Sequence, residues 1–161
     1  DYAHTPDALE SLFSLYKKLT QGKLFVVFGA TGGGRDKAKR KVMGQIADKC
    51  ADFIIVTDDD PYEEDEWAII DGVCSGINRR EGAGLWKIPD RREALRLALT
   101  MAREGDVVIA AGKGAEEVMM VRGERVQWND RKVIEELLKR NVVVEIGDDE
   151  WVERPNVCME S

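Results

Sequence analysis

Apolar and polar residues alternate along this chain in blocks of regular length. Near the start, five apolar residues recur at helical spacing and predict a helix over 6–19: Leu9, Leu12, Phe13, Tyr16 and Leu19. Thr5-Pro6, directly before them, is a typical N-cap and first-turn pair. Short apolar runs then predict strands over 23–28, 53–56, 85–88 and 106–111.

The segments between these strands carry helical patterns. We expect helices over about 36–50, 63–77 and 90–103, then a hairpin from 118–121 and 125–128, a helix over 130–138 and an edge strand over 142–146. Strands alternating with helices of this length predict an α/β fold, a single Rossmann-like, doubly wound and mostly parallel sheet with a C-terminal hairpin and edge strand. The domain is expected to span 1–146, because the tail 147–161 has no clear pattern.

Composition narrows the function classes. The 161 residues suit one domain, and 43% hydrophobic residues are enough for a core. A net charge of -7 argues against non-specific nucleic-acid binding and against docking on an anionic membrane, and no apolar run is long enough to span one. Cys50, Cys74 and Cys158 form no C-x-x-C pair, which fits a reduced, cytoplasmic setting. Because the chain opens on Asp1 and not on Met, we expect a fragment or a processed product.

In a parallel sheet, ligands bind at the carboxyl ends of the strands. The predicted loops at that edge are 29–36, 58–62, the turn after Ile88, and 112–116. The first reads Gly29-Ala-Thr-Gly-Gly-Gly-Arg35. It fails the dinucleotide fingerprint at Thr31, and neither it nor any other segment closes as a P-loop with Gly-Lys-Ser/Thr. The loop is therefore either a flexible turn or, because Arg35 stands beside free N–H groups, an anion site.

The other loops also allow two interpretations. Seven of the nine residues over 58–66 are acidic, which suits either a solvated loop before a helix or a group of carboxylates that holds a cation. No His or Cys lies nearby to strengthen a metal site, and we predict none. Gly112-Lys113-Gly114 is either a tight turn or a close backbone approach to a ligand that Glu116 would also reach. His4, the only histidine, has no evident nucleophile partner, so no catalytic residue is predicted.

Taken together, the motifs resemble the Mur ligases, and within them the C-terminal domain of the UDP-N-acetylmuramoyl-tripeptide synthetases. The resemblance covers about residues 1–140 and rests on segments that occur in the same order: Asp1-Tyr-Ala-His-Thr-Pro-Asp7, Arg35-Asp-Lys-Ala-Lys-Arg40 with Met43-Gly44, Thr57-Asp-Asp-Asp-Pro61, Pro89-Asp-Arg-Arg-Glu-Ala94, Gly105-Asp-Val-Val108, Ala111-Gly-Lys-Gly114 and Asn129-Asp-Arg131. Any one of these segments is a weak signal, whereas seven in register are specific.

The resemblance implies an ATP-dependent amide-bond ligase of peptidoglycan synthesis. ATP phosphorylates the carboxylate of a UDP-MurNAc-dipeptide, and the amine of an incoming diamino acid attacks the acyl phosphate. The implied cofactors, ATP and Mg²⁺, are bound mainly by a central domain that this chain lacks, so its partners are the N-terminal and central domains and the fragment alone is expected to be inactive. Closure of the C-terminal domain over the site would complete it and exclude water.

The same resemblance implies residue roles. Asp1 is expected at the ribose of ATP and His4 beside the nucleotide. Arg35 is expected to hold a carboxylate of the incoming amino acid. The remaining substrate contacts, which line the side-chain pocket or meet the distal end of the amino acid, fall at Asp59, Asp60, Tyr62, Gly112 and Glu116.

Three positions depart from the family pattern and bear on which amino acid is added. Asp60 replaces the usual Asn, Tyr62 replaces the Arg of members that add meso-diaminopimelate, and Ala115 replaces the usual His. An extra anion and a lost cation favour an ammonium end, so we expect lysine or ornithine over meso-diaminopimelate. A nearby lysine, Lys113 or Lys37, that moved into the place of the lost Arg would reverse this preference.

Two other interpretations remain open from the residues. One is a different ligase of the same superfamily, of the polyglutamate or cyanophycin type, although Thr5 after Ala3-His4 favours the tripeptide synthetases. The other is a standalone binding module without catalysis. A Gly-Lys-Thr/Ser P-loop encoded upstream would support a ligase, and a start codon just before Asp1 would support the module.

Overall fold

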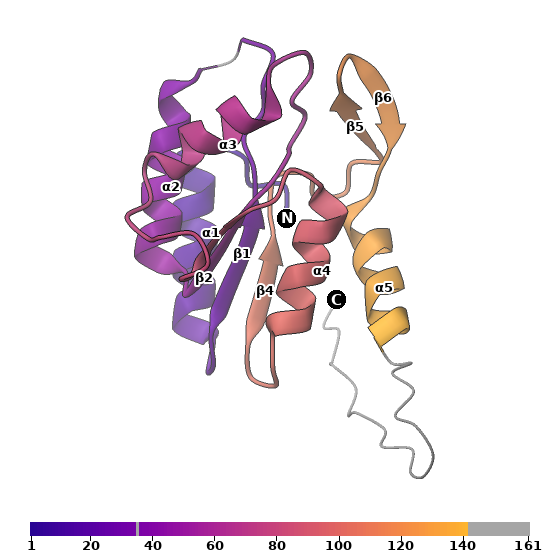
Figure 1. Cartoon of the computed structure of the whole chain (residues 1–161). Coiled ribbons are helices and arrows are strands. Elements are labelled where there is room, and N and C mark those ends of the chain that lie inside the picture. The colour runs from indigo at the N-terminus through magenta and orange to yellow at the C-terminus, as the bar shows by residue number, and fades with distance from the viewer. Residues whose placement is uncertain (35, 142–161) are drawn as a thin grey trace.

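The computed structural model describes residues 1–34 and 36–141, and these fold as one α/β unit (Figure 1). Helices and strands alternate along the first two thirds of the chain, and a hairpin and a last helix follow. The elements are α1 (Pro6–Leu19), β1 (Leu24–Phe28), α2 (Ala38–Cys50), β2 (Phe53–Val56), α3 (Glu66–Cys74), β3 (Leu85–Lys87), α4 (Arg91–Met101), β4 (Val107–Ala110), β5 (Val118–Val121), β6 (Glu124–Gln127) and α5 (Asp130–Asn141).

The central sheet is parallel and has the strand order β3-β2-β1-β4. From β1 the chain moves first to one side, through β2 and β3, and then returns to the other side of β1 to form β4. The order therefore reverses between β1 and β4, which makes the carboxyl ends of these two strands the switch point where open α/β sheets bind ligands. Every residue of β1 is buried, as its continuous apolar sequence requires.

Helices cover both faces of the sheet (Figure 1). On one face, side chains of α1, α2 and α3 pack against Val26, Ile54 and their neighbours. On the other face, α4 and α5 pack against Val27 and Ile55. The predicted doubly wound α/β architecture is confirmed, and the hairpin forms a separate antiparallel sheet of β5 and β6.

The acidic loop is longer than the sequence pattern predicted. We expected a helix over 63–77, but α3 begins at Glu66 and ends at Cys74. Asp65 caps the helix by accepting a hydrogen bond from the Ala68 N–H (2.8 Å), and Tyr62 is held by the hairpin instead, through a hydrogen bond from its N–H to the Met120 carbonyl oxygen (3.2 Å). The edge strand expected over 142–146, the domain boundary at 146 and the tail lie outside the described residues.

Candidate functional site

The amino-terminal segment lies across the end of β4. The Asp1 nitrogen donates to the Ala110 carbonyl oxygen (2.8 Å), and the Gly112 N–H donates to the Asp1 carbonyl oxygen (3.0 Å). Residues 1–4, expected beside the nucleotide, are thereby joined by backbone hydrogen bonds to the loop 111–117, which carries residues expected at the amino acid. Both sets of predicted residues meet at the switch point of the sheet.

Asp59 lies at the centre of this edge, between the ends of β1 and β4, and is only 4% exposed. A Cβ added at Gly29 would lie 3.0 Å from the Asp59 Cβ, and one added at Gly112 would collide with the Asp59 carboxylate. Gly112 therefore makes room for this side chain, whereas Gly29, where a Cβ would also collide with the Thr57 carbonyl oxygen, lets the backbone of the loop after β2 approach. Burial raises the pKa of the Asp59 carboxyl group, and the positive charges of Arg91 and Lys113 oppose the shift.

Lys113 forms ion pairs with two of the predicted substrate residues, Asp60 and Glu116. Its ammonium lies 2.9 Å from the Asp60 Oδ1 and 2.6 Å from the Glu116 Oε2, and its side chain is 1% exposed. The Asp60 Oδ1 also accepts a hydrogen bond from the Met120 N–H (2.8 Å). Burial opposes the lysine charge, but the hydrogen bonds to Asp60 and Glu116 prevail and raise the pKa of Lys113. These three side chains form an ion-paired group around a buried ammonium, which we call the lysine triad.

The lysine triad changes the expected electrostatics of the pocket. Asp60 and Glu116 were expected to offer free negative charge, but each is paired with Lys113. Two carboxylates and one ammonium leave a net charge of -1 on the triad. Lys113 and Lys37 were the two lysines that could have taken the place of the lost Arg. Lys37 also forms an ion pair, with Glu64 at 3.0 Å, so moving either lysine would break an ion pair.

Tyr62 faces a different part of the surface from the lysine triad. It lines a groove of about 430 Å³ between the acidic loop and the hairpin, whose other lining residues are Pro61, Glu63, Glu64, Asp65, Glu66, Trp67 and Arg122. Asp60 and Tyr62 both adopt positive φ angles (49° and 56°), which are uncommon for residues other than glycine. The structure thus brings four of the predicted substrate residues together, Asp59, Asp60, Gly112 and Glu116, and places Tyr62 at their side.

Arg35 lies outside the described residues, so its role stays a prediction. The rest of its loop is fixed against the acidic loop, because the Gly32 N–H donates to the Asp60 carbonyl oxygen (3.0 Å). A Cβ added at Gly33 would come within 3.2 Å of the Tyr62 ring. The glycine-rich loop therefore belongs to the same edge of the site.

A buried arginine fastens these two loops together. Arg40, whose side chain is 4% exposed, donates to both carboxylate oxygens of Glu64 (2.8 and 2.9 Å) and to the Thr31 carbonyl oxygen (3.3 Å). The hydrogen bond from Arg40 holds the pKa of Glu64 at about 2. No role was expected for Arg40 or Glu64 from the sequence, although Arg40 ends the motif 35–40 and Glu64 lies in the acidic segment 58–66.

Asp58 is the second carboxylate with a displaced pKa. Burial, followed by the neighbouring charge of Glu66, raises its pKa to about 7, while Arg91 acts in the opposite direction. The Asp58 carbonyl oxygen accepts a hydrogen bond from Arg91 (3.0 Å). Two adjacent carboxyl groups in the loop after β2, Asp58 and Asp59, are thus held where burial favours their protonated forms.

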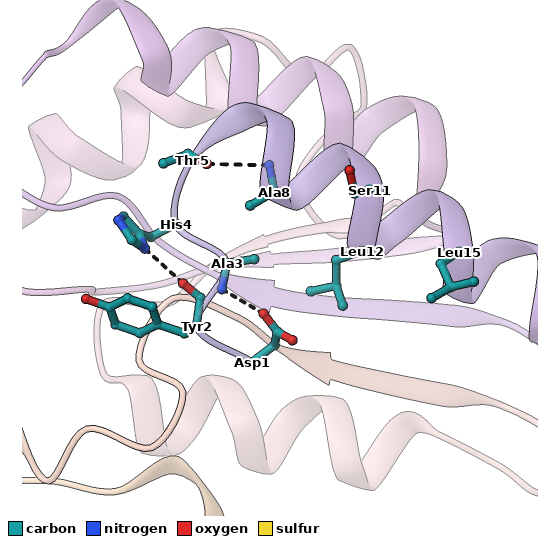
Figure 2. A pocket seen from close by; sticks show the side chains of 9 residues that line it. All are labelled: Asp1, Tyr2, Ala3, His4, Thr5, Ala8, Ser11, Leu12 and Leu15. Atoms are coloured by element: carbon teal, nitrogen blue, oxygen red, sulfur yellow. Dashed lines mark hydrogen bonds between the residues drawn. The ribbon is translucent and has the colours of Figure 1, made fainter.

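Asp1 and His4 line a groove beside α1, with a volume of about 480 Å³ (Figure 2). The Asp1 Oδ1 accepts the Ala3 N–H (2.7 Å). The His4 Nδ1 lies 2.8 Å from the Tyr2 carbonyl oxygen, which can only accept, so Nδ1 carries the proton and the Nε2 of a neutral ring is left as an acceptor. The rings of Tyr2 and His4 pack edge to face with centroids 4.7 Å apart. A planar aromatic surface and a carboxylate suit a nucleoside, whose base stacks and whose ribose hydroxyls donate.

Over residues 1–34 and 36–141, no group of three or more His, Cys, Asp or Glu side chains is arranged to hold a metal ion. Within the same residues, no helix has the length and apolar character needed to cross a membrane.

The fold and the site define an α/β domain in which the groove lined by Asp1 and His4 adjoins a cluster of carboxylates. The family described as "Mur ligase, glutamate ligase domain" matches residues 1–114. The chain belongs to this Mur ligase family.

Individual relatives are similar over most of the chain. The chain is 46% identical to the UDP-N-acetylmuramoyl-L-alanyl-D-glutamate--2,6-diaminopimelate ligase of Syntrophomonas wolfei, over 88% of the chain and 29% of that protein. It is 43% identical to the ligase of the same name from Aquifex aeolicus, over 86% and 28%. It is 42% identical to the UDP-N-acetylmuramyl-tripeptide synthetase of Borreliella burgdorferi, over 83% and 26%.

A solved structure agrees with these relatives. The structure of a UDP-N-acetylmuramoyl-L-alanyl-D-glutamate--2,6-diaminopimelate ligase superimposes with a TM-score of 0.82 at 36% identity, over 89% of this chain and 29% of that one. The chain therefore spans less than a third of the length of the relatives that it matches.

Proposed function

We propose that this chain is the C-terminal, amino-acid-binding domain of an ATP-dependent ligase that adds a diamino acid to a UDP-MurNAc-dipeptide in peptidoglycan synthesis. The observation that carries the proposal is the meeting of two features at the switch point, the Asp1–His4 groove and the cluster of Asp59 with the lysine triad. The names of the relatives, diaminopimelate ligases and tripeptide synthetases, support the same reaction.

The groove beside α1 is the proposed nucleotide contact. The Asp1 carboxylate would accept from a ribose hydroxyl, and the His4 ring would lie beside the base. The phosphates, the Mg²⁺ ion and the UDP-MurNAc-dipeptide would be held by the N-terminal and central domains of the complete ligase. ATP with Mg²⁺ supplies the activation of the dipeptide carboxylate, and we place the reaction in the cytoplasm.

The edge between the loops after β1, β2 and β4 is the proposed amino-acid site. Arg35 would take the α-carboxylate that every candidate amino acid carries. Asp59 and the lysine triad would meet the side chain, and their net negative charge suits an ammonium group. Lysine and ornithine end in an ammonium alone, whereas meso-diaminopimelate adds a carboxylate. We therefore propose lysine or ornithine as the amino acid, with meso-diaminopimelate as the competing substrate, because the names of several relatives include 2,6-diaminopimelate.

The test is a ligation assay on the complete protein that contains this chain. ATP, Mg²⁺, UDP-MurNAc-dipeptide and one amino acid at a time are supplied, and ADP release and the UDP-MurNAc-tripeptide are measured. We expect ADP release that depends on both the dipeptide and a diamino acid. ADP release with glutamate or aspartate, and none with any diamino acid, would point to another ligase of the superfamily and overturn the proposal.

A further inference from the structure

Arg91, the first residue of α4, is buried in the middle of the site and is 1% exposed. Its guanidinium makes four hydrogen bonds. Nε and Nη2 donate to the two carboxylate oxygens of Asp130 (2.8 and 2.7 Å), Nη1 donates to the Asp58 carbonyl oxygen (3.0 Å), and Nη2 donates to the Ala111 carbonyl oxygen (2.9 Å). None of the sequence motifs predicts a role in substrate binding for Arg91.

The acceptors of Arg91 belong to separate segments of the chain. Asp58 lies in the loop after β2, directly before Asp59, and Ala111 lies in the loop after β4, directly before Gly112. Asp130 is the first residue of α5 and also accepts a hydrogen bond from the Trp128 indole N–H (2.8 Å). The guanidinium therefore joins the two loops that bear the proposed amino-acid contacts and ties both to α5.

The contact needs the shape of arginine and not only its charge. A guanidinium presents five N–H donors in a rigid plane, so it can reach a carboxylate with one edge and two carbonyl groups with the other donors. A lysine ammonium at the same place is a single point, and its shorter chain cannot serve acceptors that lie on opposite sides. Because the surroundings of the Arg91 guanidinium are closed to solvent, bulk water would not reach the acceptors to replace the lost donors.

We propose that Arg91 is a positioning residue for the incoming amino acid, because its buried guanidinium sets the spacing between the loop of Asp59 and Asp60 and the loop of Gly112 and Lys113. This inference rests on the proposed function of the site. It concerns binding of the amino acid: the guanidinium reaches the pocket only through backbone carbonyl groups and through Asp130, and none of its four hydrogen bonds goes to a predicted substrate residue.

Arg79 provides a matched control. It is a partly buried arginine that, like Arg91, has a carboxylate partner, Asp48 (2.9 Å), and it donates to three carbonyl oxygens, those of Asp48, Ala51 and Asp52 (2.6 to 2.7 Å). Those acceptors lie at the end of α2 and before the start of β2, which is the edge of the sheet opposite the site. Replacing Arg79 removes a similar network without touching the pocket.

The experiment compares Arg91→Lys with Arg79→Lys in the complete ligase. KM and kcat for the diamino acid are measured together with the melting temperature. Both variants should melt at lower temperature. Only Arg91→Lys should raise the KM for the amino acid, by roughly tenfold to a hundredfold, because a displacement of about 1 Å at a binding site has effects of that size. Arg79→Lys should leave that KM within about twofold of the original.

A second variant guards against loss of folding. Asp130→Asn keeps the arginine and its bonds to Asp58 and Ala111 but weakens the pair that orients the guanidinium, so a smaller rise in KM, still more than about threefold, is expected. An unchanged KM in Arg91→Lys, or in Asp130→Asn if the former does not fold, would overturn the inference. A wild-type protein that ligates no diamino acid would overturn the proposed function instead.

Discussion

The buried ammonium of Lys113 donates to the carboxylate of Asp60 at 2.9 Å, and it does so from a loop 53 residues further along the chain. The same ammonium lies 2.6 Å from Glu116, so one cation serves two carboxylates. The resemblance led us to expect Asp60 as an added anion in place of a neutral amide. In the structure, the charge of Asp60 is largely balanced by a partner that the polypeptide already supplies.

Because Asp60 is paired with Lys113, the choice of amino acid depends on the charge of the whole cluster, which consists of Asp59 and the lysine triad. The triad keeps one net negative charge, and Asp59 stands beside it in a buried position. Burial raises the pKa of Asp59, and nearby positive charge lowers it. An ammonium group from the substrate would favour the ionised form of Asp59, which is a coupling that a carboxylate group would not provide.

We predict that His4→Ala in the complete ligase raises the KM for ATP about fivefold to thirtyfold, the effect of losing roughly 1 to 2 kcal/mol, while kcat falls less. The ring packs against Tyr2 and lines the groove that adjoins Asp1, so its loss removes a surface from the nucleotide contact and not a group from the chemistry. Steady-state kinetics at saturating amino acid measures both constants.

The control for that prediction is His4→Asn. An Asn side chain can keep the donor that His4 presents to the Tyr2 carbonyl oxygen but lacks the aromatic ring. If it behaves as His4→Ala does, the ring is the important part. A large fall in kcat with an unchanged KM for ATP in either variant would contradict the nucleotide role.

We predict that the 161-residue chain alone does not ligate. Its sequence contains no P-loop, and residues 1–34 and 36–141 show no cluster of side chains suited to a metal ion. The phosphates of ATP would meet only single lysine or arginine side chains. ADP release is measured with the isolated chain, ATP, Mg²⁺, dipeptide and amino acid. Turnover that depends on the amino acid and reaches about 1 per second or more would show the prediction to be wrong.

We predict that the free energy of unfolding of this chain falls as the pH rises from about 4 to about 7, and that Asp58 causes part of the fall. Burial and the charge of Glu66 raise the pKa of Asp58 from 3.8 to about 7. Between those values the native state keeps a proton that the unfolded state has lost, so stability decreases with rising pH. The loss is complete above about pH 7.

Urea unfolding at pH 5 and pH 8 measures this effect. Asp58→Asn has nearly the same shape and does not titrate, so the stability of the variant relative to the wild type should increase from pH 5 to pH 8. Glu104→Gln, at an exposed position before β4, is the control and should show the same difference at both pH values. An Asp58→Asn difference that does not grow with pH would mean that Asp58 is ionised at little cost.

Much of the fold follows from the sequence because local signals and burial agree there. The predicted strand over 53–56 is β2, and the predicted helix over 6–19 is α1, with Thr5 as its N-cap. The main error fell on the helix expected over 63–77, where the pattern of acidic residues suits a helix start at several positions. In the structure Asp65 caps the helix, and the Tyr62 N–H before it bonds to the hairpin, a contact between segments almost sixty residues apart.

The candidate site was also predicted only in part from the sequence. The residues expected to face ligands were read from motifs, and Asp59, Asp60, Gly112 and Glu116 do lie together. The residues that hold them in place were not foreseen. Arg40 and Arg91 lie in segments that read as ordinary charged helix starts, and a charged residue there is usually exposed to solvent. Only tertiary structure shows that both are buried and that their partners lie in other segments.

The last prediction concerns the amino acid that the ligase selects. We expect the wild-type protein to incorporate lysine or ornithine in preference to meso-diaminopimelate when all are present at equal concentration. We further expect the double variant Asp60→Asn with Tyr62→Arg to raise the incorporation of meso-diaminopimelate relative to lysine by about tenfold or more. A charge-assisted pair with the second carboxylate contributes about 1.5–3 kcal/mol, and each 1.4 kcal/mol is about tenfold in affinity.

Of the two substitutions, Asp60→Asn tests the effect of charge more directly. The Asn Oδ1 can accept the same two hydrogen bonds, from the Lys113 ammonium and from the Met120 N–H, so the loop geometry is kept while the triad changes from a net charge of -1 to zero. Glu104→Gln makes the same change of charge at the opposite edge of the sheet and should leave the preference unaltered. A wild-type preference for meso-diaminopimelate would refute the proposed choice of substrate. An unchanged ratio of meso-diaminopimelate to lysine in the double variant would mean instead that Asp60 and Tyr62 do not face the distal end of the amino acid. Losing one anion and gaining one cation beside that end would change the relative affinity for a carboxylate and an ammonium.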